Sequence, residues 1–253
     1  MKEEFYAEYY KIENVHWWFL GRWHIFLDII RREFNHRLEG IKALDVGCGT
    51  GTILGHLGSF GPAFGVDCSS EALRFCLHRG QERVVQSFAT ALPFEDESFD
   101  LVCALDLLEH VSDDVASLKE FGRVCRPDGR ILLTVPAYHF LWGRQDEIAH
   151  HLRRYTAGEL QAKIQAAGLI VRELTYFNTI LFPFIALIRL GRHLMPSLKD
   201  GELKSDFTMT RPGRLNDFLA KVFGAESAII KRVSVPFGVS ILALASKPAA
   251  GKL

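Results

Sequence analysis

Three alternate glycines follow an apolar run near the start of the chain. Residues 43–46 (ALDV) lead into Gly47, Gly49 and Gly51, and a helical pattern comes next. Glycine lets the backbone turn sharply and lets a ligand approach the main chain closely, so this loop is a candidate binding site. Asp67 ends the following apolar run, about twenty residues after the first glycine, where a carboxylate can accept both hydroxyls of a ribose.

The spacing of these glycines discriminates between cofactor classes. The dinucleotide fingerprint G-x-G-x-x-G would place its third glycine at position 52, which is Thr52. Asp45 lies two residues before Gly47, where it would repel a pyrophosphate but suits a ligand with ammonium and sulfonium groups. A nicotinamide-dependent oxidoreductase is therefore disfavoured. An ordinary strand-to-helix turn is the structural alternative, and the acid at position 67 argues against it.

A polar loop at 137–155 supplies candidates for acid–base chemistry. Histidine is the usual base near neutral pH, and Asp146 lies five residues before His151. Our hypothesis is that His151 takes a proton from an acceptor and that Asp146 orients its imidazole. The alternative is a salt-bridged connector that caps the next helix.

The same loop contains the candidate substrate-binding residues. Arginine offers a planar, bidentate donor for phosphate or carboxylate, although one of the two adjacent arginines is expected to be structural. The candidates are Tyr138, Trp142, Arg153, Arg154 and Tyr155. Outside the loop, Arg22 lies ahead of the first apolar run and is a candidate for binding a cofactor carboxylate. The aromatic segment 17–19 is interpreted as helix packing, with a substrate lid as the alternative.

The elements that must position these residues alternate between strand and helix. Short, nearly continuous apolar runs are separated by helical patterns at 50–59, 70–79 and 113–125. Such alternation predicts an α/β fold with a parallel sheet covered on both faces. The runs lie at 41–46, 63–66, 83–86, 99–105 and 130–135, with further strands expected at 169–177 and 239–245.

The domain organisation follows from this pattern. Residues 1–40 are predicted to be an N-terminal helical segment, and residues 41–177 with 236–253 are predicted to form the core. Residues 178–235 are interpreted as a cap inserted before the last strand. Within the core, Thr156 is expected to cap a helix that Gly168 ends.

Composition narrows the protein class. The chain has 253 residues, a net charge of zero and 48% hydrophobic residues, which excludes disorder and collagen and argues against nucleic acid as a partner. The five cysteines show no zinc spacing, so no metal site is expected. The charged N-terminus lacks a signal-peptide core, and a cytoplasmic protein is expected. Segment 178–195 is either a cap helix or a peripheral contact with the inner membrane surface.

Five segments, taken in order, resemble the motifs of class I S-adenosylmethionine-dependent methyltransferases. The segments are 45–51 (DVGCGTG), 65–69 (GVDCS), 91–100 (ALPFEDESFD), 105–111 (LDLLEHV) and 123–130 (RVCRPDGR). The resemblance implies a Rossmann-like sheet of seven strands, the last antiparallel and inserted between the fifth and sixth. It also implies S-adenosylmethionine as the cofactor and S-adenosylhomocysteine as its product.

The resemblance assigns the cofactor-binding residues one by one. The glycine loop would hold the amino-acid end of the cofactor, the acid at its start would orient the ammonium, and the acid at 67 would bind the ribose. One departure is Phe88, which stands where the family often has an aspartate for the adenine amino group, so backbone and apolar packing must replace it. The set is Asp45, Gly47, Cys48, Gly49, Gly51, Asp67, Cys68, Phe88, Ala89, Leu105 and Arg22.

Two further segments, 13–22 (ENVHWWFLGR) and 141–155 (LWGRQDEIAHHLRRY), are similar to a methyltransferase subgroup of the type 11/12 kind often encoded among surface-glycan genes. We therefore expect methyl transfer to an oxygen, or a nitrogen, of a small-molecule, sugar or lipid-linked acceptor. A non-catalytic protein that binds S-adenosylmethionine is the alternative. An RNA methyltransferase is disfavoured by the neutral charge.

Overall fold

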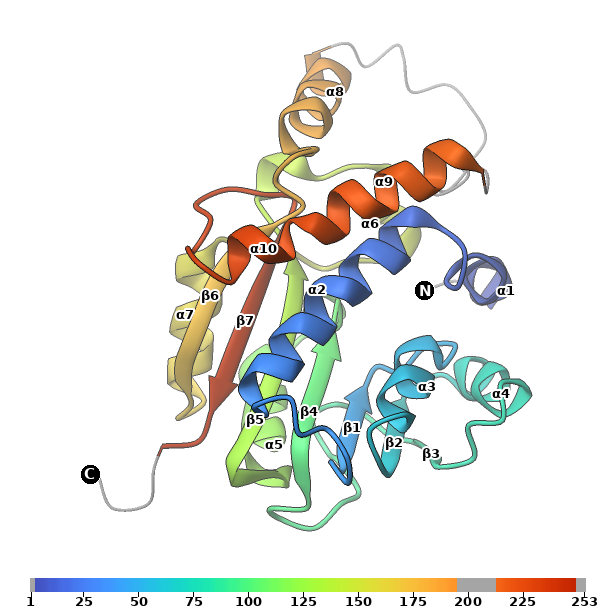
Figure 1. Cartoon of the computed structure of the whole chain (residues 1–253), viewed down its shortest axis with the longest axis vertical. Helices are drawn as coiled ribbons and strands as arrows, with labels where there is room; N and C mark the ends of the chain where they lie inside the picture. Colours follow the sequence, from blue (N-terminus) through green and yellow to red (C-terminus); the bar gives the residue numbers. More distant parts are fainter. Residues whose placement is uncertain (1–2, 195–212, 249–253) are drawn as a thin grey trace.

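The computed structural model describes residues 3–194 and 213–248, which form one seven-stranded sheet with helices on both faces (Figure 1). The strand order is β3-β2-β1-β4-β5-β7-β6. Strands β1 to β5 run parallel, and β7 pairs antiparallel with both β5 and β6. The predicted Rossmann-like topology is confirmed. The strands are β1 (Ala43–Val46), β2 (Ala63–Asp67), β3 (Val84–Gln86), β4 (Phe99–Leu105), β5 (Cys125–Pro136), β6 (Ile170–Phe177) and β7 (Ser240–Ser246).

Side chains cap the beginnings of several helices. Ser69 caps α4, Asp113 caps α5, and Thr156 and Glu159 form a reciprocal capping box at α7, which ends before Gly168. The helices are α1 (Glu3–Ile12), α2 (Trp17–Glu33), α3 (Thr52–Gly58), α4 (Ser70–His78), α5 (Asp114–Val124), α6 (Arg144–Ala149), α7 (Ala157–Ala166), α8 (Phe182–Leu194), α9 (Arg214–Ala225) and α10 (Ser227–Ile230). Two short 3₁₀ turns, η1 (Leu108–His110) and η2 (His139–Leu141), follow β4 and β5.

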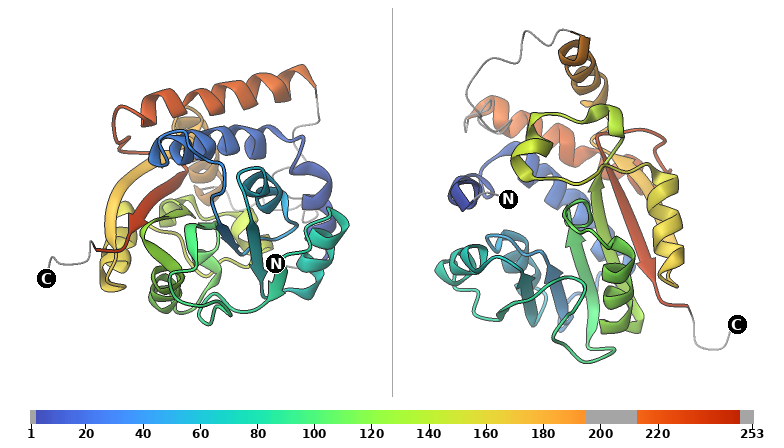
Figure 2. Two further views of the ribbon diagram at one scale, coloured as in Figure 1. Left: turned by 60° about the horizontal axis from the view of Figure 1, so that its bottom comes forward. Right: turned by 180° about the vertical axis from the view of Figure 1, so that it is seen from behind.

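Helices cover both faces of the sheet (Figure 2), and an apolar layer is buried on each face. Helices α5 and α7 bury Phe121 and Leu160 against one face. Helices α2 and α3 bury Phe26 and Leu54 against the other. Because both faces are covered, β4 and β5 are buried along almost their whole apolar length, as their sequence pattern predicts.

The N-terminal segment is two helices rather than one. The chain breaks at residues 13–16, where the imidazole of His16 accepts a hydrogen bond from the Trp18 amide and caps α2. Helix α9 lies along α2. The two helices can approach closely because Gly21 has no side chain: a Cβ there would lie only 2.7 Å from Cδ1 of Phe223. Asn216 of α9 accepts from the Trp17 amide and donates to the Val15 carbonyl, both at 2.8 Å.

The insertion before β7 divides into two parts that lie in different places. Helix α8 stands beyond the carboxyl ends of β4 and β5, whereas α9 and α10 lie beside α2 over one face of the sheet (Figure 1). Residues 195–212 of the predicted cap, with residues 1–2 and 249–253, lie outside the described residues. Within the described ranges, every helix is too short or too polar to cross a bilayer.

Candidate active site

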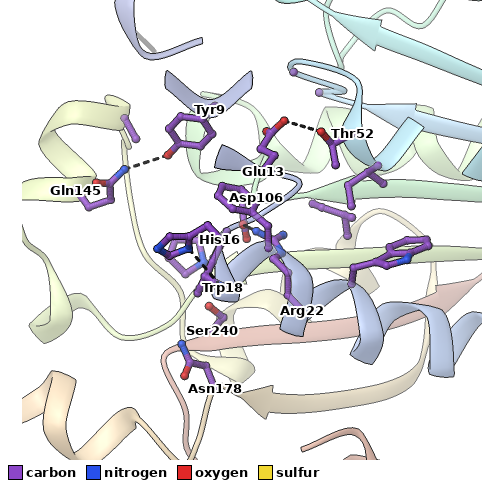
Figure 3. Close-up of a pocket in the computed structure, with 18 of the residues that line it drawn as sticks. Tyr9, Glu13, His16, Trp18, Arg22, Thr52, Asp106, Gln145, Asn178 and Ser240 are labelled. Atoms are coloured by element: carbon purple, nitrogen blue, oxygen red, sulfur yellow. Dashed lines mark hydrogen bonds and ion pairs between the residues drawn. The ribbon is translucent and has the colours of Figure 1, made fainter. Parts of the chain in front are cut away.

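A cavity of about 560 Å³ lies at the carboxyl edge of the sheet. Its walls come from the glycine loop, the segment after β4, the polar loop after β5, α8, and the N-terminal residues around α1 and α2 (Figure 3). Ligands of open α/β sheets bind at this edge, and small-molecule sites commonly measure roughly 300–1,000 Å³. The cavity thus brings the predicted cofactor loop and the predicted base to one place.

The glycine loop turns as its sequence predicts. Gly47 has φ of 73°, and its amide donates to the Val66 carbonyl at 2.7 Å. A Cβ there would lie 2.8 Å from the Leu107 side chain, so only glycine fits. Asp67 accepts from the Gly49 amide at 3.0 Å and from the Ser69 amide at 2.9 Å. The acid at the end of β2 therefore fixes the shape of the loop directly.

Buried carboxylates surround this loop. Asp45 is buried, lines the cavity, and has one oxygen, Oδ2, without a hydrogen-bond partner among the described residues. Burial, followed by the negative charges of Asp67 and Glu13, raises the pKa of Asp45 to about 8. The excess of acid beside an open cavity favours a cationic ligand.

Glu13 reaches the glycine loop from the break between α1 and α2. Its Oε2 accepts hydrogen bonds from the hydroxyls of Thr50 and, at 2.7 Å, Thr52 (Figure 3), and lies 3.3 Å from a guanidinium nitrogen of Arg79. Burial raises the pKa of the Glu13 carboxyl despite these partners. The contact ties the N-terminal segment to the cofactor loop.

Arg22 places a cation on the cavity wall, as predicted. Its Nη1 donates to Oδ2 of Asp106 at 2.6 Å, and its guanidinium carbon lies 4.2 Å from the ring centroid of Trp18. Asp106 follows β4 directly and has φ of 54°, a left-handed conformation that aspartate tolerates better than most residues. The pair is available to bind a zwitterion.

The predicted Asp146–His151 pair is present in the structure. Nδ1 of His151 lies 2.9 Å from Oδ1 of Asp146, and Arg154 donates to both oxygens of that carboxylate, at 2.8 and 3.0 Å. Burial alone would raise the pKa of Asp146, but the bonds from His151 and Arg154 lower it to about 2. Because an ionised carboxylate only accepts, Nδ1 carries a proton, and Nε2 is the lone-pair nitrogen of the neutral imidazole. His151 lines the cavity.

Most of the predicted substrate-binding residues lie elsewhere, which corrects that expectation. Tyr138 stacks on Tyr176 and Phe140, and neither Tyr138 nor Trp142 lines the described cavity. Arg153 forms an ion pair with Asp114 at the start of α5. Tyr155 is a core residue whose hydroxyl donates to the Asp114 carboxylate at 2.9 Å and lies 3.1 Å from the Leu108 carbonyl oxygen. Arg154 lines the cavity but is occupied by Asp146 and the Ala137 carbonyl.

The cofactor residues divide into two groups. Asp45, Gly47, Cys48, Gly49, Leu105 and Arg22 line the cavity. Asp67 and Cys68 lie beside it at the end of β2, Gly51 caps α3, and Ala89 packs against the core. Phe88 is 69% exposed and lies outside the lining of the cavity.

Sequence reasoning missed several residues of the cavity. Glu13, Asp106 and Glu109 all line it, and two of them directly follow the buried strand β4. Acidic residues just past the end of a parallel strand lie at the ligand-binding edge, and that signal was present in the sequence. No sequence signal predicts that Glu13 contacts the glycine loop, where its partner Thr50 lies 37 residues further along the chain.

Comparison with known proteins agrees with this geometry. Residues 44–133 match the family described as a methyltransferase domain. The chain carries a class I methyltransferase domain. The demethylmenaquinone methyltransferase of Staphylococcus aureus (strain MRSA252) is 37% identical over 102 residues, which cover 37% of this chain and 42% of that protein. The ubiquinone biosynthesis O-methyltransferase of Parvibaculum lavamentivorans is 27% identical over 156 residues, 54% of this chain and 62% of that one.

Among solved structures, a methyltransferase in complex with the Haloferax volcanii Trm112 methyltransferase activator has a TM-score of 0.59 at 19% identity. The match covers 99% of this chain and 97% of that one, and it shows the fold. The chain spans roughly half the length of the curated relatives described above. The methyltransferase domain match ends at residue 133, so it contains the glycine loop but neither member of the Asp146–His151 pair.

The Asp146 network leads to a prediction about stability. Asp146→Asn leaves Arg154 buried beside a neutral partner, so we expect the free energy of unfolding at neutral pH to fall by about 3 kcal/mol. Because the folded-state pKa of Asp146 lies below its usual value of 3.8, its stabilisation is present above about pH 4 and is lost as the pH falls towards 2. The difference between variant and wild type, measured by urea unfolding, should shrink over that range.

Asp96→Asn is the matched control, because Asp96 is 73% exposed and its partner Arg123 keeps Glu120. A change of no more than about 0.5 kcal/mol is expected there. Equal effects of the two substitutions would contradict the role of Asp146.

Proposed function

We propose that this protein is an S-adenosylmethionine-dependent methyltransferase that transfers a methyl group to an oxygen of a small, partly apolar acceptor. The observation that carries the proposal is that one cavity contains the acidic glycine loop and the Nε2 atom of His151. The first suits a cationic cofactor, and the second suits an acceptor that must lose a proton.

The residues at the loop fit the cofactor. The buried oxygen of Asp45 that has no partner among the described residues matches the ammonium group, and Arg22 matches the carboxylate. Asp67 still has lone pairs for ribose hydroxyls, beyond those used by the loop amides. When bound, the cofactor supplies a methyl group on a positively charged sulfur, which an acceptor atom attacks in line. The protein's part is alignment and exclusion of water.

The acceptor side of the cavity has apolar walls, and His151 on that side can act on a hydroxyl. Trp17, Trp18 and Phe19 contribute from α2, and Ile185 and Ile188 contribute from α8. An acceptor with a ring or an aliphatic portion fits such a lining. The curated relatives are named for methylation in menaquinone and ubiquinone synthesis, which supports a small-molecule acceptor here. His151, held by Asp146, acts on its hydroxyl.

A protein that only binds S-adenosylmethionine is the second candidate. It would need the glycine loop but not a histidine that lines the cavity and is held by a carboxylate. The hydrogen bonds that fix Asp146, His151 and Arg154 in place argue for chemistry at that point.

Cofactor affinity should depend on pH through Asp45. Below about pH 8 its carboxyl is protonated in the free protein, so a cationic ligand must displace a proton to bind. Calorimetric titration with S-adenosylmethionine should show affinity weakening by up to roughly tenfold per unit as the pH falls from about 7.5 to about 5.5. Asp45→Asn should bind weakly and without this slope, whereas Asp96→Asn should keep it. The same slope in both variants would contradict the assignment.

Loss of His151 should separate turnover from cofactor binding. With an acceptor that the wild type methylates, His151→Ala should reduce S-adenosylhomocysteine formation by about 10²-fold or more, while calorimetry still shows S-adenosylmethionine binding. His139→Ala is the control, because this imidazole lies in the same loop but is 60% exposed and pairs with Glu159. Near-normal turnover in His151→Ala would remove the proposed role.

The outer side of α8 supports a lipid-linked acceptor. Phe184 and Leu187 are 66% and 69% exposed, while Ile185 on the same helix lines the cavity. A helix with one apolar side in the cavity and another facing outwards can lie on a membrane and admit a lipid-borne substrate. We therefore include peripheral membrane contact through α8 in the proposal, with a simple cap helix as the alternative.

Vesicle sedimentation distinguishes these two roles of α8. The wild-type protein should pellet with anionic phosphatidylglycerol vesicles, and Leu187→Glu should weaken that association severalfold. Leu77→Glu is the control, because Leu77 is also exposed but lies on α4. Failure of the wild type to pellet would leave only the cap.

A further inference from the structure

Glu109 is a buried acid that the proposed function does not use. It lies in η1, directly after β4, its side chain is fully buried, and neither carboxyl oxygen has a hydrogen-bond partner among the described residues. An isolated buried carboxylate is costly, so such a group normally holds a proton or a cation.

Two imidazoles face this carboxyl. The rings of His110 and His151 meet edge to face with centroids 4.7 Å apart, and Nε2 of His151 lies 4.0 Å from Oε1 of Glu109. One ligand atom from each of the three residues falls within 4.8 Å of the others. All three residues line the cavity. One carboxylate and two histidines thus converge at the edge of a space large enough for substrate.

The protonation states suit metal ligation. Asp146 fixes the proton of His151 on Nδ1, so the lone pair of Nε2 points towards Glu109. A histidine that donates its other nitrogen to a carboxylate is the usual arrangement around a bound metal, and Arg154 holds that carboxylate in turn.

We propose that Glu109, His110 and His151 bind a divalent transition-metal ion at the acceptor end of the cavity. Two imidazoles and one carboxylate match Zn²⁺ and its neighbours in the first transition row rather than Mg²⁺ or Ca²⁺, which prefer oxygen ligands. Three protein ligands with the remaining positions open to a cavity is the pattern of catalytic rather than structural sites.

A bound ion would activate a hydroxyl group of the acceptor for methyl transfer. This role of the ion rests on the proposed function. A hydroxyl that binds beside a divalent cation loses its proton more readily, and that proton leaves to solvent. The oxygen lone pair forms the new O–C bond while the electron pair of the C–S bond stays on sulfur. With the ion bound, Nε2 of His151 is a ligand, so the ion takes the place of the imidazole in activating the hydroxyl, and the acceptor class is an alcohol or phenol that can reach a metal.

Ion binding can be measured with Co²⁺ as the probe, without cofactor or acceptor. Full-length protein freed of metal with a chelator should take up one Co²⁺ per chain, followed by visible absorption and by calorimetry, and Zn²⁺ should displace it. Glu109→Gln and His110→Gln should each weaken Co²⁺ binding about tenfold or more. Thermal unfolding identifies any variant that fails to fold. If one of the two variants fails, Co²⁺ binding by the other variant tests the site.

His139→Gln is the matched control and should bind Co²⁺ like the wild type. Absence of stoichiometric Co²⁺ binding, or equal binding by wild type, Glu109→Gln and His110→Gln, would overturn the site and leave Glu109 as a protonated acid. Displacement of Co²⁺ by Mg²⁺ as readily as by Zn²⁺ would overturn the choice of ion. These results are independent of S-adenosylmethionine binding, so failure of the ion site and failure of methyl transfer are distinguishable.

Discussion

Moving a carboxylate out of water costs several kcal/mol unless hydrogen bonds or positive charge replace the lost hydration. At the carboxyl edge of this sheet, some buried carboxylates have hydrogen bonds and ion pairs that offset this cost, and others do not. Asp146 is satisfied by His151 and Arg154, and Glu13 is satisfied by two threonine hydroxyls and Arg79. Asp45 and Glu109 each keep buried oxygens without partners among the described residues. These two acids lie on the cavity wall, so the free energy not recovered on folding is available for binding positive charge there.

Asp45 and Glu109 mark two regions of the cavity that differ in the chemistry of their side chains. Around Asp45, the glycine loop and Arg22 present charges of both signs, as a zwitterion requires. Around Glu109, the lining combines the imidazoles of His110 and His151 with the aromatic side chains of α2, so polar and apolar groups share that region. Asp106 joins the regions, because its carboxylate pairs with Arg22 and its charge raises the pKa of Glu109.

Local patterns in the sequence predicted those structural features that depend only on residues close together in the chain. The alternation of apolar runs and helical patterns, the turn at Gly47 and the five-residue spacing of Asp146 and His151 all act over short stretches of chain. The roles of Arg153 and Tyr155 could not be predicted in this way, since both depend on Asp114, 39 and 41 residues earlier. The position of Glu13 on the glycine loop similarly depends on how α1 packs, which no local pattern encodes.

The pairing of α2 with α9 has a consequence for how the protein can diversify. Asn216 holds the chain at Val15 and Trp17 across about 200 positions of sequence, so both ends of the chain build the acceptor wall around a central region that builds the cofactor loop. Substitutions in these ends, at positions other than Glu13 and Arg22, can reshape the acceptor pocket without disturbing the glycine loop. Likeness that covers residues 44–133 alone therefore says little about which molecule is methylated, and related chains with the same core can serve different pathways.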